Sequence, residues 1–226
     1  MTPRLSSLDF ATLHAAFDAP ISPLDCGTQC AVFNPDHIPV CCDICAAVPV
    51  AYQPEWTYLK ANTSLWHLWR GDECAREQAD RAPLEQLTPS HLYLLACQGP
   101  ASCDRFFRSV SCRQFPFYPY FTSDFRFIGM TYDWEFRHSC WVISNLAQVT
   151  LEYRSQFFSA FDQIFSTWLE DMESYIELSA ETREHYQALH RRIPLLHRNG
   201  QAYLVSPASE RLTRISPQQL PRFTPY

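Results

Sequence analysis

The sequence has little lysine, little glycine and no long apolar run. Lys60 is the only lysine and the net charge is −6, so no basic stripe of the kind that binds nucleic acid is present. The chain has only 5 glycines against 17 prolines, which indicates rigid loops rather than flexible linkers. No apolar run reaches the roughly 18 residues of a membrane span, and the stretch 1–17 lacks the apolar core of a signal peptide. We therefore expect a cytoplasmic protein that binds neither nucleic acid nor membrane.

Common catalytic motifs are also missing. The sequence contains no GxGxxG, GxxxxGK[ST], HExxH or GxSxG motif, so dinucleotide-binding, P-loop, zincin and nucleophile-elbow interpretations lack support. Phe33 stands where the CxxxCxxC motif of radical-SAM enzymes would need its third cysteine after Cys26 and Cys30. The His-x-Glu and Pro-Cys-x-x-Cys motifs of zinc deaminases do not occur either. The cysteines are left as the chemically informative residues.

Eight of the 10 cysteines form two groups, the first over Cys26 to Cys45 and the second over Cys97 to Cys112. Clustered cysteines in a reducing compartment more often bind metal or carry out redox chemistry than form disulfides. Buried, inert thiols are the alternative interpretation, because cysteine also packs as a small hydrophobic residue. We expect the two groups to meet around metal, with these ligands: Cys26, Cys30, Cys41, Cys42, Cys97, Cys103 and Cys112. The sequence leaves open whether Cys45 or Cys140 is also a ligand, and Cys74, which has no cysteine nearby, is interpreted as structural.

Arginine accompanies the second cysteine group, where Arg105, Arg108 and Arg113 lie close together in the sequence. A guanidinium group stabilises a nearby thiolate and lowers the pKa of the thiol. We interpret Arg113 as a cofactor-supporting residue that offsets thiolate charge and donates hydrogen bonds to sulfur or to carbonyls of the cysteine loop. A surface ion pair is the alternative role for Arg113.

The segment from Cys103 to Phe117 resembles the YkgJ-like family of zinc- or iron-chelating cysteine-cluster proteins. The similarity is strongest at Cys112-Arg113-Gln114-Phe115-Pro116-Phe117, and Cys97 matches the preceding family cysteine. Arg108 falls where the family has its arginine, which implies a cofactor-binding role, although Ser109 replaces the usual proline. The resemblance implies a metal cofactor rather than a particular reaction.

The first half of the family pattern is present only in a dispersed form. The family has a CxxCGxCC-like cluster, whereas here Cys26-Gly27 supplies the Cys-Gly and Cys41-Cys42 supplies the doublet. The resemblance therefore covers about residues 24–120, and the identity of the ligands in the first half depends on how this segment folds.

Thiolate ligands select zinc or iron–sulfur clusters over harder cations. Seven candidate thiolates exceed the four that one zinc ion takes, and an iron–sulfur cluster tolerates irregular spacing, so we favour iron–sulfur slightly. Three functions remain open: a metal or iron–sulfur protein in electron transfer or a small oxidoreductase, a zinc-stabilised protein-interaction module, and a thiol enzyme. The thiol enzyme would use a cysteine of low pKa such as Cys112 beside Arg113.

For the fold, we expect a single α+β domain over residues 1–226. It would have an irregular cysteine-rich metal-binding core with short strands over about 24–120, packed against helices, and a helical and hairpin part over about 140–226. Hydrophobic periodicity and end signals predict helices over 7–17, 55–69, 72–80, 149–178 and 181–192. Residues 24–45 read as a loop broken by Gly and Pro. We expect the two C-terminal helices to serve a protein partner.

Strand signals are fewer. Residues 92–95 form a short apolar run that would deliver Cys97 where a strand ends, and 125–132 is rich in strand formers. Asn199-Gly200 between two apolar stretches is a strong hairpin signal, so we predict a hairpin near the C-terminus. Cys140 beside His138 reads as a buried thiol under Trp141 rather than as a ligand.

Overall fold

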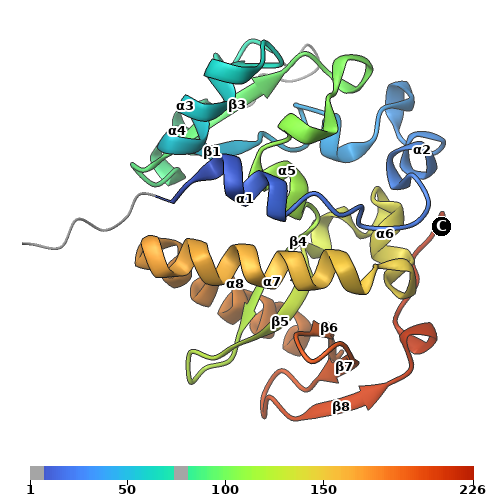
Figure 1. Cartoon of the computed structure of the whole chain (residues 1–226). Coiled ribbons are helices and arrows are strands. Elements are labelled where there is room, and N and C mark those ends of the chain that lie inside the picture. Colours follow the sequence, from blue (N-terminus) through green and yellow to red (C-terminus); the bar gives the residue numbers. More distant parts are fainter. Residues whose placement is uncertain (1–7, 74–80) are drawn as a thin grey trace, which may run out of the picture. The chain divides into compact units, whose positions relative to one another are not determined.

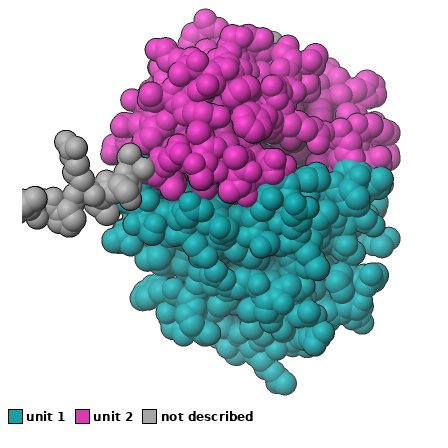
Figure 2. Space-filling view, viewed as in Figure 1, with its two compact units in different colours: residues 1–5, 19–24, 116–226 teal, residues 6–18, 25–115 magenta. Residues whose placement is uncertain are grey.

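The computed structural model describes residues 8–73 and 81–226, and it combines α-helices with two antiparallel sheets (Figure 1). The chain divides into two compact units, which Figure 2 distinguishes by colour. Of the described residues, unit 1 contains Ala19–Leu24 and Pro116–Tyr226, and unit 2 contains 8–18, 25–73 and 81–115. The predicted α+β class is confirmed. No helix in these described ranges is long and apolar enough to cross a membrane.

Unit 2 is built on a three-stranded antiparallel sheet of order β1-β3-β2. Its strands are β1 (Val50–Tyr52), β2 (Trp66–Leu68) and β3 (Leu92–Cys97). As predicted, β3 delivers Cys97 at its end, where Cys97 pairs with Trp66 of β2. The core beside the sheet contains Ala51, Leu59, Leu65, Trp66 and Leu95.

The remaining elements of unit 2 are short. Its α-helices are α1 (Phe10–Ala16), α2 (Cys26–Ala31), α3 (Gln53–Asn62), α4 (Arg81–Leu87) and α5 (Val110–Gln114). Four 3-10 turns, Pro35–His37, Val40–Cys42, Pro100–Ser102 and Arg105–Phe107, link them. The predicted loop over 24–45 therefore contains one helix and two turns, because the side chain of Asp25 accepts from the amides of Gly27 and Thr28 and caps α2.

The predicted helix over 55–69 is wrong at its C-terminal end. Helix α3 stops at Asn62, where the Thr63 amide donates to the Leu59 carbonyl and the Thr63 hydroxyl accepts from the Leu65 amide. Such side-chain bonds compete with helix continuation. Trp66–Leu68 then forms β2 instead of a last helical turn.

Two other helix predictions for unit 2 adjoin residues outside the described ranges. Asp9 is the N-cap of α1, because its carboxylate accepts from the Ala11 amide; Ser7, where the predicted 7–17 helix begins, lies outside the described residues. In the predicted 72–80 helix, residues 74–80 lie outside the described residues.

Unit 1 contains a five-stranded antiparallel sheet of order β4-β5-β6-β7-β8. The strands are β4 (Phe117–Phe121), β5 (Phe127–Tyr132), β6 (Ile193–His197), β7 (Ala202–Val205) and β8 (Leu212–Ile215). Both faces of β4 are buried. Phe117 and Phe121 contact aromatic rings of α7 (Leu151–Thr167), whereas Tyr118 and Tyr120 pack with residues of α8 (Leu169–Ala188). The short elements Trp134–His138, α6 (Trp141–Ser144), Leu146–Gln148 and Pro217–Gln219 complete the unit.

The C-terminal helices divide at a different place from the one predicted. The periodicity predicts helices over 149–178 and 181–192, but α7 ends at Thr167 and α8 runs without interruption to Ala188. The backbone turns at Trp168, just after Ser166 and Thr167, whose hydroxyls both donate to the Gln163 carbonyl. Bonds of this kind loosen the end of a helix. No Gly or Pro marks the turn, which is why the pattern missed it.

The predicted C-terminal hairpin is confirmed. Strands β6 and β7 pair antiparallel, with Leu196 opposite Ala202. The His197 amide donates to the Gln201 carbonyl and closes a three-residue loop, in which Gly200 takes a φ of 85°. A left-handed residue at the end of a three-residue loop is the position that favours glycine.

Gly129 in β5 offers a test of how tightly the larger sheet is packed. A Cβ at this position would lie 2.8 Å from the Leu196 carbonyl oxygen and 2.9 Å from a Leu195 methyl carbon. We predict that Gly129→Ala lowers the free energy of unfolding by about 1–3 kcal/mol, because overpacking forces the neighbouring strand to shift. Urea denaturation measures the change. Ser209→Ala in an exposed turn is the matched control and should stay near wild type; an equally stable Gly129→Ala would contradict the packing argument.

Candidate functional site

One cavity in unit 2 is lined by five thiols. Cys41 and Cys42 belong to the turn Val40–Cys42, Cys97 ends β3, Cys103 follows the turn Pro100–Ser102, and Cys112 lies in α5. The cavity has a volume of about 240 Å³. Two cysteines of the first group, Cys41 and Cys42, therefore meet the three of the second group in space, and this part of the prediction agrees with the structure.

The rest of the cavity wall is largely apolar. Besides Gln98, Gly99 and Arg108, the lining residues are Ile38, Ile44, Ala47, Pro49, Leu65, Trp66 and Pro100. Trp66 has its indole N–H directed away to the Phe107 carbonyl at 2.7 Å. The five cysteines are half-buried, and an apolar wall of this kind strengthens electrostatic interactions around their sulfurs.

Two N–H groups point at sulfur. The Nε of Arg108 donates to Cys103 Sγ at 3.3 Å, and the Gly99 amide donates to Cys97 Sγ at 3.4 Å. Gly99 has a φ of 89°, a conformation that glycine adopts without strain and that this tight turn requires. Donors of this kind stabilise the thiolate form, which is the form that binds metal.

The pKa values of the thiols differ within the cavity. Burial raises the pKa of Cys112 to about 12 and also raises the pKa of Cys97. The hydrogen bond from Cys41, whose Sγ lies 3.9 Å from that of Cys42, lowers the pKa of Cys42 to about 7, with the charge of Arg108 acting in the same direction. The sequence-based expectation that Cys112 has a low pKa is therefore wrong, because desolvation outweighs the nearby guanidinium groups.

Arg108 contacts one thiol of the cavity, Cys103. Burial acts to lower its pKa, but its hydrogen bond to Cys103 and the charges of Cys103, Cys41 and Cys112 together raise it. The guanidinium of Arg108 therefore stays protonated against the sulfur-lined wall.

Cys26 and Cys30 lie outside the lining of this cavity. Both are in α2, where Cys30 is buried. Burial raises the pKa of Cys26 to about 11, and the charges of Cys30 and Asp25 add to this effect. Asp25 also forms an ion pair with Arg105 at 2.6 Å, which links the start of α2 to the second cysteine group. The metal-ligand role of Cys26 and Cys30 stays a prediction.

Cys45 and Cys140 are not ligand candidates from the geometry. Cys45 is disulfide-bonded. Cys140 belongs to unit 1 and is buried there, as the sequence predicts. Cys74 lies outside the described residues.

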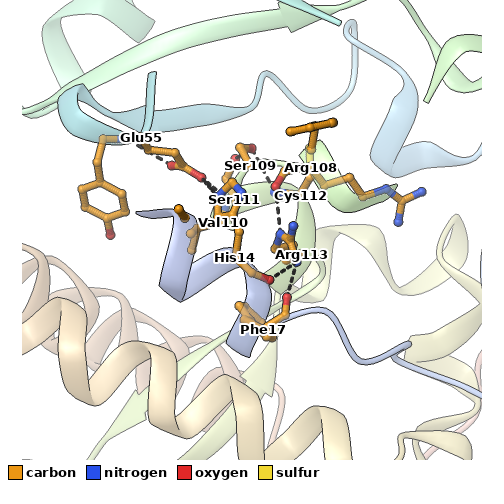
Figure 3. Close-up of polar contacts among 12 residues, drawn as sticks. His14, Phe17, Glu55, Arg108, Ser109, Val110, Ser111, Cys112 and Arg113 are labelled. Carbon is orange, nitrogen blue, oxygen red and sulfur yellow. Dashed lines mark hydrogen bonds and ion pairs between the residues drawn. The ribbon is translucent and has the colours of Figure 1, made fainter. Parts of the chain in front are cut away.

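Arg113 supports the backbone of the cysteine loop. Its side chain is buried, and it donates to the backbone carbonyls of Arg108, Phe106, His14 and Phe17. Figure 3 shows its guanidinium directed at the carbonyls of His14 and Phe17. The alternative role as a surface ion pair is wrong.

The carbonyls that Arg113 holds include part of the segment between Cys103 and Cys112. Residues 106–108 belong to this segment, and the carbonyls of both Phe106 and Arg108 accept from the guanidinium. Of the two acceptor types that the sequence suggests for Arg113, sulfur or carbonyls of the cysteine loop, the structure shows the carbonyls.

Glu55 and His14 are residues of this region that sequence reasoning missed. Their side chains are fully buried, and Glu55 Oε1 lies 2.8 Å from His14 Nε2 (Figure 3). The same oxygen accepts from the Val110 amide at 2.7 Å, while Oε2 accepts from the Tyr52 amide at 3.3 Å. Glu55 thereby ties the start of α5 to α1 and α3. The sequence marks Glu55 only as an acidic residue in the first turn of a helix.

The five thiols line one cavity, but their side chains do not converge on a single metal position. Among residues 8–73 and 81–226, no three His, Cys, Asp or Glu side chains are grouped closely enough to hold a metal ion as they stand. The donor type fits a thiophilic metal, and binding would require the side chains around the cavity to turn toward one centre.

Comparison with known proteins does not assign the chain to a family. A scan against protein-family models, a search of curated proteins and a search of solved structures each found no significant match. The resemblance to the YkgJ-like family therefore rests on the residues quoted above.

Arg113 should contribute more to the free energy of unfolding than an exposed arginine of the same region. We predict that Arg113→Leu lowers the free energy of unfolding by about 2–5 kcal/mol, because buried carbonyls lose their donors. Arg113→Lys should fall between, since an ammonium cannot reach all these acceptors at once. Chemical denaturation followed by circular dichroism measures both variants.

Arg105→Leu is the matched control. Arg105 pairs with Asp25 while its side chain is 58% exposed, so its loss should cost under about 1 kcal/mol. Equal losses for Arg113→Leu and Arg105→Leu would show that the carbonyl contacts of Arg113 contribute little.

Proposed function

We propose that unit 2 binds an iron–sulfur cluster or zinc through cysteine thiolates. The observation that carries this proposal is the cavity lined by Cys41, Cys42, Cys97, Cys103 and Cys112. Thiolate donors favour zinc and iron–sulfur clusters, and either group takes about four of them.

The residues divide into ligands and supporting groups. Cys97, Cys103 and Cys112 would each supply one sulfur, and the Cys41-Cys42 pair would supply the fourth. Arg108 would offset the negative charge of the thiolates while donating to Cys103. A bound cluster would supply one-electron transfer, whereas zinc would supply a structural crosslink.

The dimensions of the cavity favour the cluster. A volume of about 240 Å³ is many times the roughly 10–15 Å³ that a cavity needs to hold one water molecule. A single ion would leave much of this space empty. A polyatomic cluster in an apolar wall would instead be shielded from water, a property that sets the reduction potential of such centres.

Metal binding at this site must release protons. Cys97 and Cys112 hold their protons at neutral pH because burial raises the pKa of both thiols, and metal takes the thiolate form. A falling pH therefore weakens binding, since protons compete for the same sulfurs.

Serine substitutions test the ligand set. We predict that Cys97→Ser and Cys112→Ser each lower the metal content of anaerobically purified protein to less than half the wild-type value, because a hydroxyl replaces a thiolate poorly. Elemental analysis, sulfide analysis and the absorption spectrum measure iron, zinc and cluster content together. A visible chromophore would identify iron–sulfur, and a colourless zinc protein would identify the structural alternative.

Cys140→Ala is the control for these variants. It removes a buried thiol from unit 1 and should keep the metal content of wild type. Protein purified without stoichiometric metal under anaerobic conditions, or loss of metal in Cys140→Ala as large as in Cys112→Ser, would contradict the proposed site.

Thiol chemistry is a second candidate function, favoured by the Cys41-Cys42 pair. Their sulfurs are 3.9 Å apart and Cys42 has a pKa of about 7. A Cys42 thiolate would attack a small disulfide, and the Cys41 thiolate would then displace the second thiol from the mixed disulfide. The net reaction converts two protein thiols to a vicinal disulfide and one disulfide to two thiols.

Alkylation of metal-free protein distinguishes this candidate. We predict that Cys42 reacts with iodoacetamide with a half-maximal rate near pH 7, whereas Cys112 stays unreacted at this pH because burial keeps it protonated. Peptide mass spectrometry after short exposure at several pH values locates the modified thiol. Uniform slow alkylation of Cys42 and Cys112 would remove the support for a reactive thiol.

The C-terminal helices remain our proposed surface for a protein partner. Leu151 of α7 and Leu169 of α8 are 65% and 64% exposed. Isolated exposed leucines are common on protein surfaces. The proposal that a partner binds at these helices therefore rests on the sequence pattern and not on these two side chains.

A further inference from the structure

Unit 1 contains a groove between α7 and the turn of the β6–β7 hairpin. The groove has a volume of about 710 Å³, and its lining includes Arg154, Ser155, Ser159, Asp162, Gln163 and Arg198. It shares no residue with the cysteine-lined cavity, so what it binds is independent of the proposed metal site.

Arg154 is the unusual residue of this groove. Its side chain is only 5% exposed, and its Nη2 donates to the carbonyls of His197 and Gln201 at 2.8 and 2.9 Å. Its Nε–H is buried and has no acceptor among the described residues. A buried donor without an acceptor carries the full cost of its lost hydration, which is a reason to look for a ligand.

The charge of Arg154 is also uncompensated. Burial lowers the pKa of Arg154 to about 10, and no carboxylate of the described chain opposes this effect. The group remains protonated at neutral pH. Buried charges are otherwise paired with an opposite charge in most proteins.

The other charges of the groove cancel. Arg198 lies 2.6 Å from Asp162, and its guanidinium also packs over the ring of Phe158 at 5.6 Å. Two guanidinium groups and one carboxylate line the groove, which leaves one positive charge on a chain whose net charge is −6. Leu151, the first residue of α7, lines the same groove, so the positive end of this helix dipole adds to the potential there.

We propose that this groove binds a small polar molecule that carries an oxyanion, either phosphate or carboxylate. The planar donor fork of arginine matches both groups. Ser155 and Ser159 place hydroxyl groups on the adjacent exposed face of α7, where they suit the polar part of such a ligand. The anion supplies the countercharge that Arg154 lacks.

Binding is tested with inorganic phosphate and with citrate, each titrated into the whole protein at an ionic strength held constant with sodium chloride. Isothermal calorimetry gives the dissociation constant, and NMR of the arginine Nε–H signals reports on Arg154, identified by its loss in Arg154→Gln. We expect saturable binding of at least one anion, together with a saturable shift of the Arg154 signal.

Ser159→Trp fills the groove and leaves Arg154 in place, so it tests the site even if Arg154→Gln loosens the hairpin. Both variants should weaken binding at least tenfold, while Arg126→Gln, which removes a 68% exposed arginine paired with Asp124, should bind like wild type. The proposal would be overturned if Ser159→Trp bound the anions with wild-type affinity, or if neither phosphate nor citrate showed saturable binding to the wild-type protein. A response of equal size in all variants would also overturn it, since this would be nonspecific screening.

Discussion

The buried carboxylate of Glu55 is the contact on which the cysteine-lined cavity depends. It accepts hydrogen bonds from the amides that precede α3 and begin α5, and it lies against His14 of α1. A carboxylate without these partners would be very costly to bury, so the three helices must keep this arrangement. Helix α5 carries Cys112, and its orientation sets where this sulfur enters the cavity wall. The position of one thiol is therefore set by a residue that is not part of the cavity lining.

Arg108 and Arg113 have different contacts, although the sequence suggests a cofactor-supporting role for both. Arg108 contacts the sulfur of Cys103, whereas Arg113 holds the carbonyls of Phe106 and Arg108 together with two carbonyls at the end of α1. Arg113 thus fixes the backbone from which Arg108 projects. Ser109, which stands where the YkgJ-like pattern has proline, is fully buried, and its hydroxyl caps α5 by accepting from the Cys112 amide. A proline ring could not accept that bond, so this departure from the pattern has a local structural use.

The sequence predicted features that apolar runs and turn residues mark, and it missed features that hydroxyl-to-backbone bonds, buried pairs and burial decide. The strand that ends at Cys97 and the hairpin at Asn199-Gly200 follow from apolar runs and turn chemistry, which act over a few residues. The approach of Cys41 and Cys42 to the second cysteine group was also predicted, whereas Cys26 and Cys30 lie outside the cavity lining. The ends of α3 and α7 were not, because hydroxyl-to-backbone bonds at Thr63, Ser166 and Thr167 decide them without Gly or Pro. The Glu55–His14 pair joins residues 41 positions apart, and the pKa of Cys112 depends on burial; neither has a sequence signal.

The protonation of the cavity thiols connects the two functions that we propose for the site. With Cys112 and Cys97 protonated by burial, the metal-free cavity holds few thiolates, and Cys42 is the thiol poised to lose its proton near neutral pH. An arriving metal would therefore bind the Cys42 thiolate first and displace protons from Cys97 and Cys112 afterwards. The same Cys42 sulfur cannot be a ligand and a nucleophile at once. Metal binding and thiol exchange are thus competing uses of one residue, and the metal supply would decide between them.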